Sequence, residues 1–282
     1  MKIFLTGATG FIGSHFLNHA LGQGHEVIAL RRTNSQPRIP LNREPFWVDG
    51  NLDGDHRSSL DGVNVFVHLA SHTPNPPYDT LDRCLYWNVF ASLQLAKYAV
   101  EMGVKHFIVA GTCFEYGRTA DKEENLDVNS PLEPTLSYPT SKAAASVAFL
   151  GLARELNLHM KLLRIFQVYG EGEDATRLWP SLRDAAISGK DFPMSYGEQV
   201  RDFISVTDVA QQLIQALDFN DSLPGQPHVA HLANGEPETL LSFAQRWWSH
   251  WGGKGSLLVG EMPYRKNETM RIASRKKHET HR

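Results

Sequence analysis

The sequence has few cysteines and no long apolar run. Its 282 residues include two cysteines, Cys84 and Cys113, and neither belongs to a C-x-x-C pair. Two cysteines cannot build a disulfide framework, so a reducing compartment is expected. The first residues have the pattern of a strand rather than of a secretory signal. No apolar stretch approaches the roughly 20 residues that span a bilayer. We therefore expect a cytoplasmic protein with no membrane partner.

A strong charge bias and a metal-ligand pattern are also lacking. The formal net charge is -3, which does not favour a nucleic-acid partner. His15 and His19 lie four residues apart, but the glutamate of an H-E-x-x-H motif is missing between them. His68 and His72 share this spacing across the end of a strand pattern, where four residues do not define one helical face. We expect no metal site.

A glycine-rich turn, Thr-Gly-Ala-Thr-Gly-Phe-Ile-Gly, follows the apolar run at 3–5 and opens a helical pattern over 11–22. Gly7 would allow the tight turn, Gly10 would let the backbone approach a pyrophosphate, and Gly13 would let the helix pack closely on the strand. The N-terminus of the helix would face the anion. This turn predicts a bound dinucleotide.

Apolar runs alternate with helical patterns along the chain. This β-α-β order, with strands that are apolar on both faces, predicts an α/β fold with a Rossmann-type, doubly wound parallel sheet. Its site would lie at the C-terminal ends of the strands. The expected strands are 3–5, 25–30, 46–48, 63–70, 105–110, 159–166 and 201–206, and the expected helices are 11–22, 83–102, 138–156 and 207–219.

The same pattern divides the chain into three parts. Residues 1–166 are expected to form the NAD(P)-binding Rossmann domain, to which residues 201–232 return. Residues 167–200 carry several glycines and prolines among short helical patches, and with 233–274 they are expected to form a smaller substrate-binding lobe. The basic residues 275–282 are expected to be a frayed tail.

Tyr138 and Lys142 lie four residues apart at the start of an expected helix, so their side chains share one face. The pKa of a free tyrosine is about 10, and a neighbouring ammonium lowers it. Proton transfer to or from a carbonyl then becomes feasible. Pro139 suits the first turn of the helix, and Ser137 is the expected N-cap.

Together these motifs resemble the extended short-chain dehydrogenase/reductase family, and within it the NAD-dependent epimerase/dehydratase group. The resemblance covers nearly the whole chain and implies a nucleotide-sugar epimerase, dehydratase or 4-ketoreductase. Its further landmarks are His-Leu-Ala-Ser at 68–71, Asn88-Val89, Gly-Thr-Cys-Phe-Glu-Tyr-Gly at 111–117, Leu-Arg-Ile-Phe-Gln-Val-Tyr-Gly at 163–170 and Arg-Asp-Phe-Ile-Ser-Val-Thr-Asp-Val at 201–209.

The resemblance also assigns roles to residues. Tyr138 is the acid or base, the hydroxyl of Thr112 hydrogen-bonds the sugar oxygen, and Lys142 holds the nicotinamide ribose. The implied cofactor contacts are Gly7, Thr9, Gly10, Phe11, Ile12, Gly13, Arg31, Arg32, Asn51, Leu52, Leu69, Ala70, Ser71, Asn88, Tyr138, Lys142 and Phe166. The implied substrate contacts are Thr73, Cys113, Phe114, Gln167, Arg177, Arg201 and Arg265.

The residues after the second strand indicate which cofactor is preferred. Arg31 and Arg32 stand where NAD-preferring relatives have an aspartate, and arginines complement the 2'-phosphate of NADP(H). We expect NADP(H) to be preferred, with NAD(H) as the alternative if the two arginines are only surface charges. Asn51 and Leu52 stand where the family usually has Asp-Leu or Asp-Ile beside the adenine.

Departures from the family pattern narrow the chemistry. The sugar 4,6-dehydratases of the family have an Asp-Glu pair after the active-site threonine, whereas this chain has Cys113 and Phe114, so dehydration is not expected. Cys113 could be a second acid or a packing residue. The carboxylate of Glu115 could face the site or cap a loop.

The substrate is expected to be a nucleotide-diphosphate sugar. Arg201 and Arg265 resemble two family arginines that contact the diphosphate, and forked charge-assisted hydrogen bonds are strong phosphate contacts. Gln167 replaces the usual asparagine, and Arg177 precedes Leu-Trp-Pro in the covering region. The expected activity is NADP-dependent reduction of a nucleotide-linked 4-keto sugar. A 4-epimerase and a non-catalytic nucleotide-binding member of the family are the alternatives.

The resemblance also implies a homodimer. Relatives often pack the helices that correspond to 83–102 and 138–156 into a four-helix bundle. The residues that could line such a seam, or could equally face their own sheet, are Leu85, Leu93, Ala96, Phe149 and Leu152.

Overall fold

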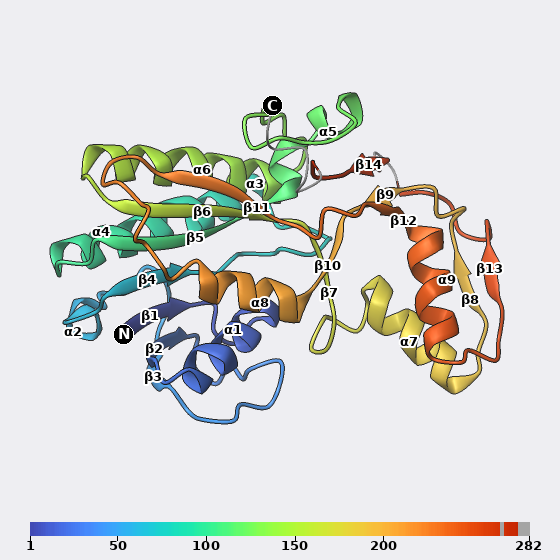
Figure 1. The fold of residues 1–282 in the computed structure, drawn as a ribbon, viewed down its shortest axis with the longest axis horizontal. Coiled ribbons are helices and arrows are strands. Elements are labelled where there is room, and N and C mark those ends of the chain that lie inside the picture. Colours follow the sequence, from blue (N-terminus) through green and yellow to red (C-terminus); the bar gives the residue numbers. More distant parts are fainter. Residues whose placement is uncertain (266–267, 276–282) are drawn as a thin grey trace.

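Seven parallel strands form the central sheet of the computed structural model, which describes residues 1–265 and 268–275. The strands are β1 (Lys2–Thr6), β2 (Glu26–Arg31), β3 (Phe46–Asp49), β4 (Val65–His68), β5 (His106–Thr112), β6 (His159–Ile165) and β11 (His228–Leu232). Their order is β11-β6-β5-β4-β1-β2-β3 (Figure 1). The order reverses between β1 and β4, and ligands of such sheets bind beyond the carboxyl ends of the strands at this point. The predicted Rossmann-type sheet is confirmed.

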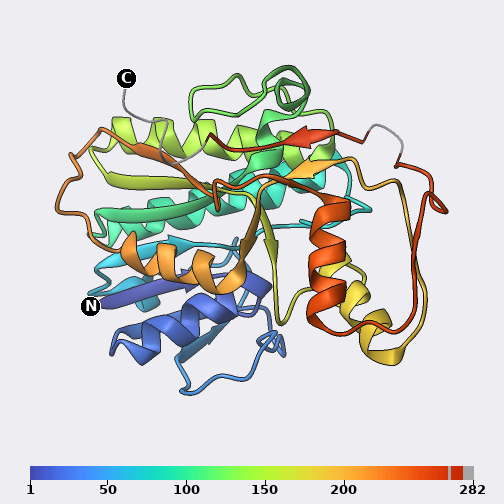
Figure 2. The same ribbon diagram turned by 45° about the vertical axis from the view of Figure 1, so that its right-hand side comes forward.

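Helices cover both faces of the sheet. The helices α1 (Phe11–Gly22) and α8 (Val206–Gln215) lie on one face, and α4 (Ser92–Glu101) and α6 (Ser137–Glu155) lie on the other (Figure 2). Successive residues of β1 alternate between the two cores: Ile3 and Leu5 pack with Phe16 of α1, whereas Phe4 packs with Phe149 of α6. This covering on both sides explains why the residues of the central strands β1, β2 and β4 are nearly all buried.

The helix expected at 83–102 is divided into three pieces. It consists of α3 (Leu81–Leu85), the π-helical segment η1 (Tyr86–Ala91) and α4, and a short helix α2 (Arg57–Leu60) precedes β4. The π-helical segment contains Asn88, whose side chain is buried. Wide turns of this kind often occur at functional sites.

The C-terminal part of the chain adds small sheets and two helices beside the main sheet (Figure 1). Its elements are β7 (Gln167–Tyr169), α7 (Leu178–Ser188), β8 (Phe192–Met194), β9 (Val200–Arg201), β10 (Phe203–Ser205), β12 (Glu238–Thr239), α9 (Leu240–His250), β13 (Leu257–Val259) and β14 (Arg271–Ile272). The small sheets pair β10 with β7, β13 with β8, and β9 with both β12 and β14. Of the tail expected at 275–282, only Arg275 lies within the described residues.

The later strands differ from the sequence pattern in two places. The strand expected at 201–206 is split into β9 and β10, because Asp202 between them is fully buried and accepts hydrogen bonds from Asn234 N (2.8 Å) and Gly235 N (3.0 Å). The strand β11 was not expected, since the two histidines of His-Val-Ala-His-Leu obscure its apolar pattern. The helix expected at 207–219 ends earlier, at Gln215.

In the parts of the chain that the structure describes, no helix combines the length and apolar character needed to cross a bilayer.

After β5 the chain forms the short helices η2 (Cys113–Tyr116) and α5 (Thr119–Lys122). These helices lead across the top of the molecule in Figure 1 to the start of α6.

Candidate active site

The glycine turn between β1 and α1 has the sterics that its sequence predicts. Gly7 has φ +77°, and a Cβ there would lie 2.6 Å from Ala70 N. A Cβ on Gly13 would lie 2.0 Å from Gly7 O, so only glycine lets α1 approach β1 this closely. Gly10 caps α1 without a side-chain hydrogen bond, which leaves the first backbone N–H groups of the helix for a ligand. This cradle fits the pyrophosphate of a dinucleotide.

The end of β4 lies against this turn. Leu69 N donates to Thr6 O (3.2 Å), and Ala70 N donates to Thr6 Oγ1 (3.3 Å). The hydroxyl of Ser71, the next residue, is buried and has no hydrogen-bond partner among the described residues. His68 is buried, and burial lowers the pKa of its imidazole to about 3, so it remains neutral beside Thr6.

The two arginines after β2 differ in their surroundings. Arg31 Nε donates to Asp49 Oδ1 at 2.9 Å, and its guanidinium lies over the ring of Trp47 at 4.6 Å. Arg32 is exposed. The predicted adenine residues follow β3: Asn51 is exposed, and Leu52 is half-buried against the core. Thr9 Oγ1 accepts a hydrogen bond from Ser35 Oγ (2.8 Å).

Tyr138 and Lys142 lie in the first turns of α6, and both side chains are buried. Lys142 Nζ donates to Ala110 O at 2.7 Å, which fixes the ammonium at the end of β5. Burial lowers the pKa of Lys142 and raises the pKa of Tyr138. The expectation that Lys142 lowers the pKa of Tyr138 is not met in this structure, because burial raises this pKa and the group that opposes the shift is the hydroxyl of Ser71.

The expected helix cap at Ser137 was wrong. The N-cap of α6 is Leu136, and it makes no side-chain cap hydrogen bond. Ser137 is the first helical residue, and its Oγ donates to Asp79 O at 2.6 Å. This hydrogen bond ties the start of α6 to the loop after β4.

Thr112 ends β5 and caps the short helix η2. Its Oγ1 accepts from Phe114 N (3.3 Å), while its own N donates to Glu115 Oε1 (2.8 Å). Glu115 Oε2 accepts from Ser146 Oγ (2.8 Å) and from Arg164 Nε (3.0 Å). Burial raises the pKa of Glu115, against the charge of Arg164. Of the two roles left open for Glu115, the structure shows the capping one.

The residues beside Thr112 pack in the protein interior. Cys113 is buried with Tyr116 and Phe166, and Phe114 lies half-buried against the same cluster. Burial raises the pKa of the Cys113 thiol to about 12. Cys113 is therefore a neutral packing residue, which was one of its two expected roles.

Asn88 connects the loop after β4 to α6. Its Oδ1 accepts from His72 N (2.7 Å), and its Nδ2 donates to Ser141 Oγ (2.9 Å). His72 Nε2 also lies 2.8 Å from Asp79 Oδ2. Thr73 has φ +47°, a backbone conformation that β-branched residues rarely adopt.

The loop places Tyr78 against Tyr138, a contact that the sequence did not predict. The two ring centroids are 5.3 Å apart, with planes inclined at 33°. Burial raises the pKa of Tyr78, and the charges of Arg177 and Arg265 oppose this shift. Two predicted substrate arginines therefore lie within electrostatic range of Tyr78. The only sequence signal for Tyr78 was an aromatic residue directly after the prolines at 74–77.

The other predicted substrate residues are held by protein contacts. Arg201 is 7% exposed and donates to Glu268 Oε1 (2.8 Å) and Thr269 O (2.7 Å). Arg177 Nε lies 3.6 Å from Glu173 Oε1, and burial raises the pKa of Glu173 to about 7. Gln167 is half-buried in β7.

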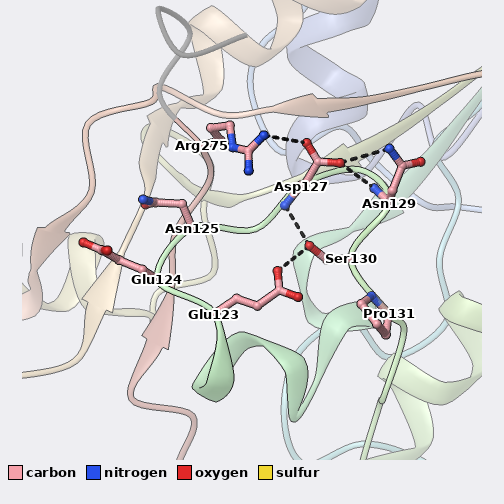
Figure 3. A pocket seen from close by; sticks show the side chains of 8 residues that line it. All are labelled: Glu123, Glu124, Asn125, Asp127, Asn129, Ser130, Pro131 and Arg275. Carbon is pink, nitrogen blue, oxygen red and sulfur yellow. Dashed lines mark hydrogen bonds and ion pairs between the residues drawn. The ribbon is translucent and has the colours of Figure 1, made fainter. Parts of the chain in front are cut away.

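Two other features do not coincide with this site. A surface hollow is lined by Glu123, Glu124, Asn125, Asp127, Asn129, Ser130, Pro131 and Arg275, none of which is a predicted site residue (Figure 3). Its polar groups bond to one another, since Ser130 Oγ donates to Glu123 Oε2 (2.5 Å). Across residues 1–265 and 268–275, no group of three or more His, Cys, Asp and Glu side chains could hold a metal ion. His15 Nε2 instead bonds Glu171 O at 2.8 Å.

Comparison with known proteins connects this geometry to a family. A dTDP-6-deoxy-L-talose 4-dehydrogenase (NAD(+)) of Aggregatibacter actinomycetemcomitans is 24% identical over 279 residues, which cover 96% of this chain and 98% of the relative. A UDP-glucose 4-epimerase of Corynebacterium glutamicum is 26% identical over 263 residues, covering 84% of this chain and 76% of the relative.

A solved structure also resembles the whole chain. An NAD-dependent NDP-hexosamine 5,6-dehydratase involved in tunicamycin biosynthesis has a TM-score of 0.85 and 26% identity, covering 99% of this chain and 90% of that structure. The family model described as "NAD dependent epimerase/dehydratase family" matches residues 3–230. The chain thus belongs to the NAD-dependent epimerase/dehydratase family, a family of enzymes within the extended short-chain dehydrogenases/reductases.

Proposed function

We propose that this enzyme reduces the 4-keto group of a nucleotide-linked sugar with NADPH. The observation that carries this proposal is the placement of Tyr138 and Lys142 one turn apart in α6, both buried, with the Lys142 ammonium fixed at Ala110 O. A phenol whose pKa is raised holds its proton at neutral pH, and reduction of a carbonyl requires an acid that delivers a proton to the oxygen. The bound cofactor supplies the hydride.

The neighbouring residues suit this role. Thr112 Oγ1 accepts its protein hydrogen bond from Phe114 N, so the hydroxyl proton remains for the substrate oxygen. Lys142 is held at Ala110 O, one helical turn from Tyr138, and its proposed role is to stabilise the negative charge that develops as Tyr138 releases its proton.

The turn after Thr112 supports reduction over dehydration. Cys113 is buried with a pKa of about 12, Phe114 has no titratable group, and both oxygens of Glu115 are held by protein donors. None of these three side chains can act as a second acid or base near neutral pH.

The arginines support a diphosphate-linked substrate. Arg177 and Arg265 lie close enough to Tyr78 for their charges to affect its pKa, and Tyr78 contacts Tyr138. The proposal assigns the diphosphate to these two arginines and the substrate lobe to residues 167–200 and 233–274. Arg201 could reach the diphosphate only by leaving Glu268, so its proposed role is to hold the segment that carries Arg265.

The cofactor preference follows from the arginines after β2. Arg32 is exposed at the end of β2, and Arg31 presents a guanidinium oriented by Asp49 and Trp47. Guanidinium groups suit bidentate contact with a 2'-phosphate. The proposal is therefore that NADP(H) is preferred over NAD(H), which several similar proteins name as their cofactor.

A turnover experiment tests the reductase. A nucleotide 4-keto sugar is incubated with stoichiometric NADPH, and oxidation of the cofactor is followed together with formation of the 4-hydroxy sugar. In parallel, a nucleotide hexose is incubated anaerobically with substoichiometric cofactor. Net reduction in the first reaction supports the proposal, whereas full conversion to the epimer in the second identifies a 4-epimerase. Absence of any turnover would indicate a nucleotide-binding protein.

The proposed assembly is a homodimer through η1, α4 and α6. Of the predicted seam residues, Ala96, Phe149 and Leu152 lie in the core beside their own sheet, and Leu85 and Leu93 pack partly buried against this core, which was the alternative placement. Phe90 in η1 and Val147 in α6 are instead 66% and 63% exposed. Two large apolar side chains on neighbouring helices suit a buried seam.

The proposed compartment is the cytoplasm. Cys84 and Cys113 are both free and buried. A reducing compartment keeps such thiols in this state.

A further inference from the structure

The loop between β4 and α3 is fixed in place at both of its ends. Asn88 Oδ1 accepts from His72 N, and Asp79 bonds to His72 Nε2 (2.8 Å) and Arg83 Nε (3.0 Å). Ser137 Oγ donates to Asp79 O, which joins the loop to the first turn of α6. Tyr78 directly precedes Asp79, so these bonds determine where its ring lies.

The loop also has a strained backbone at Thr73, with φ +47°. A β-branched residue with positive φ is an outlier, and strain of this kind persists where the surrounding structure enforces it, often at functional sites. Three prolines at positions 74, 76 and 77 further restrict the chain before Tyr78. The loop is therefore built to hold one shape rather than to move freely.

The ring of Tyr78 contacts a residue that the proposed reaction uses. It packs against the ring of Tyr138 at an inclination of 33°, with ring centroids 5.3 Å apart. Tyr78 also lies within electrostatic range of Arg177 and Arg265. Within residues 1–265 and 268–275 the hydroxyl of the half-buried Tyr78 has no hydrogen-bond partner, and it is not among the unpartnered side-chain atoms that are closed off from solvent. A half-buried phenol in this position has a donor available for a ligand.

We infer that Tyr78 lines the sugar subsite and donates its hydroxyl to the sugar, between the carbonyl at Tyr138 and the diphosphate at Arg177 and Arg265. This inference rests on the proposed function, because it takes the reacting carbon and the diphosphate from it. The ring forms one wall of the subsite, and the hydroxyl distinguishes sugars by the position of their own hydroxyls. Tyr78 is a specificity-determining residue and does not transfer the proton.

The test compares ligands that differ only in the sugar. Calorimetry measures the dissociation constants of the glucose derivatives of UDP, dTDP and CDP and of the matching nucleoside diphosphates, for the wild type and Tyr78→Phe. The variant keeps the ring and its contact with Tyr138 but loses the donor. We expect the nucleotide sugar to bind about tenfold more weakly, the effect of one lost hydrogen bond, and the nucleoside diphosphate to bind as before.

The control is Tyr86→Phe, which removes an exposed hydroxyl that bonds Asp53 (2.9 Å) on a neighbouring segment. It should leave both ligands unaffected. Equal weakening of the sugar-bearing and sugar-free ligands by Tyr78→Phe would place the hydroxyl on the diphosphate and overturn the inference. Unchanged binding of both would overturn it as well. If the wild type binds none of these nucleotides, the proposed function fails, and the inference fails with it.

Discussion

Glu115 Oε2 accepts a hydrogen bond of 3.0 Å from Arg164 Nε, and both side chains are buried. Gly111 lies opposite Arg164 in the pairing of β5 with β6 and leaves room for this contact. A Cβ on Gly111 would lie 2.8 Å from Glu115 Oε1 and 3.0 Å from Arg164 Cγ. Because Glu115 also caps the turn at Thr112, the buried pair fixes a residue of the proposed site.

Loss of this pair should destabilise the fold. Glu115→Gln leaves the Arg164 charge buried without a counter-charge, which typically lowers the free energy of unfolding by about 3 to 5 kcal/mol. Urea unfolding followed by circular dichroism measures the change. The matched control is Glu133→Gln, which breaks an exposed pair with Lys122 and should cost less than about 1 kcal/mol. Similar losses for the two variants would contradict the role given to the buried pair.

Tyr138→Phe should abolish most of the activity and spare the fold. Removal of a general acid lowers the rate by about 100- to 10,000-fold, and the ring retains its contact with Tyr78. Turnover of the nucleotide 4-keto sugar gives the rate, and fluorescence titration with NADPH shows whether the cofactor still binds. A variant that retains wild-type turnover would remove Tyr138 from the chemistry.

Glu173 should make stability depend on pH. Burial raises the pKa of its carboxyl from 4.5 to about 7, so the folded state keeps the proton to a higher pH than the unfolded state. The contribution of Glu173 to the free energy of unfolding is therefore greatest below the pKa of this carboxyl in the unfolded state, and it falls as the pH rises through about 7. Between pH 4.5 and about pH 7 the free energy of unfolding decreases by up to about 3 kcal/mol.

Glu173→Gln removes this titration. The free energy of unfolding of the variant, relative to wild type, should rise between about pH 4.5 and about pH 7.5 by up to about 3 kcal/mol. Urea unfolding across this range measures the difference. Glu171→Gln serves as the control, because this neighbouring carboxylate is largely exposed. If the difference between Glu173→Gln and wild type stays constant with pH, Glu173 does not titrate in this way.

The cofactor preference should depend on Arg32. Arg32→Ser removes a charged donor proposed to contact the 2'-phosphate, which should raise KM for NADPH about tenfold or more and leave KM for NADH unchanged. Steady-state kinetics with both cofactors measures the ratio. Arg43→Ser removes an exposed arginine from the same surface loop and should not alter the ratio. Equal efficiency of the wild type with NADH and NADPH would refute the preference itself.

The oligomeric state should respond to charges placed on η1 and α6. Phe90→Glu or Val147→Glu would bury a carboxylate in the proposed seam, so either variant should convert a dimer to a monomer. Light scattering coupled to gel filtration gives the mass. The control is Ile187→Glu, which alters a residue of α7 that is 64% exposed. This variant should have the same mass in solution as the wild type. A monomeric wild type at the same concentration would exclude the seam.

The features that the sequence predicted are those governed by local rules. The glycine turn could be identified because each glycine meets a steric demand within one strand-turn-helix unit. Tyr138 and Lys142 could be paired because one helix fixes their spacing. The contact of Tyr78 with Tyr138 and the ion pair of Glu115 with Arg164 were not predicted, because each joins elements that only the folded sheet brings together.

The pairing of β9 determines when the proposed substrate-binding side of the molecule can fold. Arg201 lies on β9, which is bordered by β12 at Glu238–Thr239 and by β14 at Arg271–Ile272. Contacts between residues so far apart in sequence form late, and a chain made from its N-terminus lacks both partners until synthesis has passed them. On the ribosome, the glycine turn is therefore complete long before the strands that flank Arg201 have been synthesised. We expect the growing chain to bind a dinucleotide before it can bind a sugar.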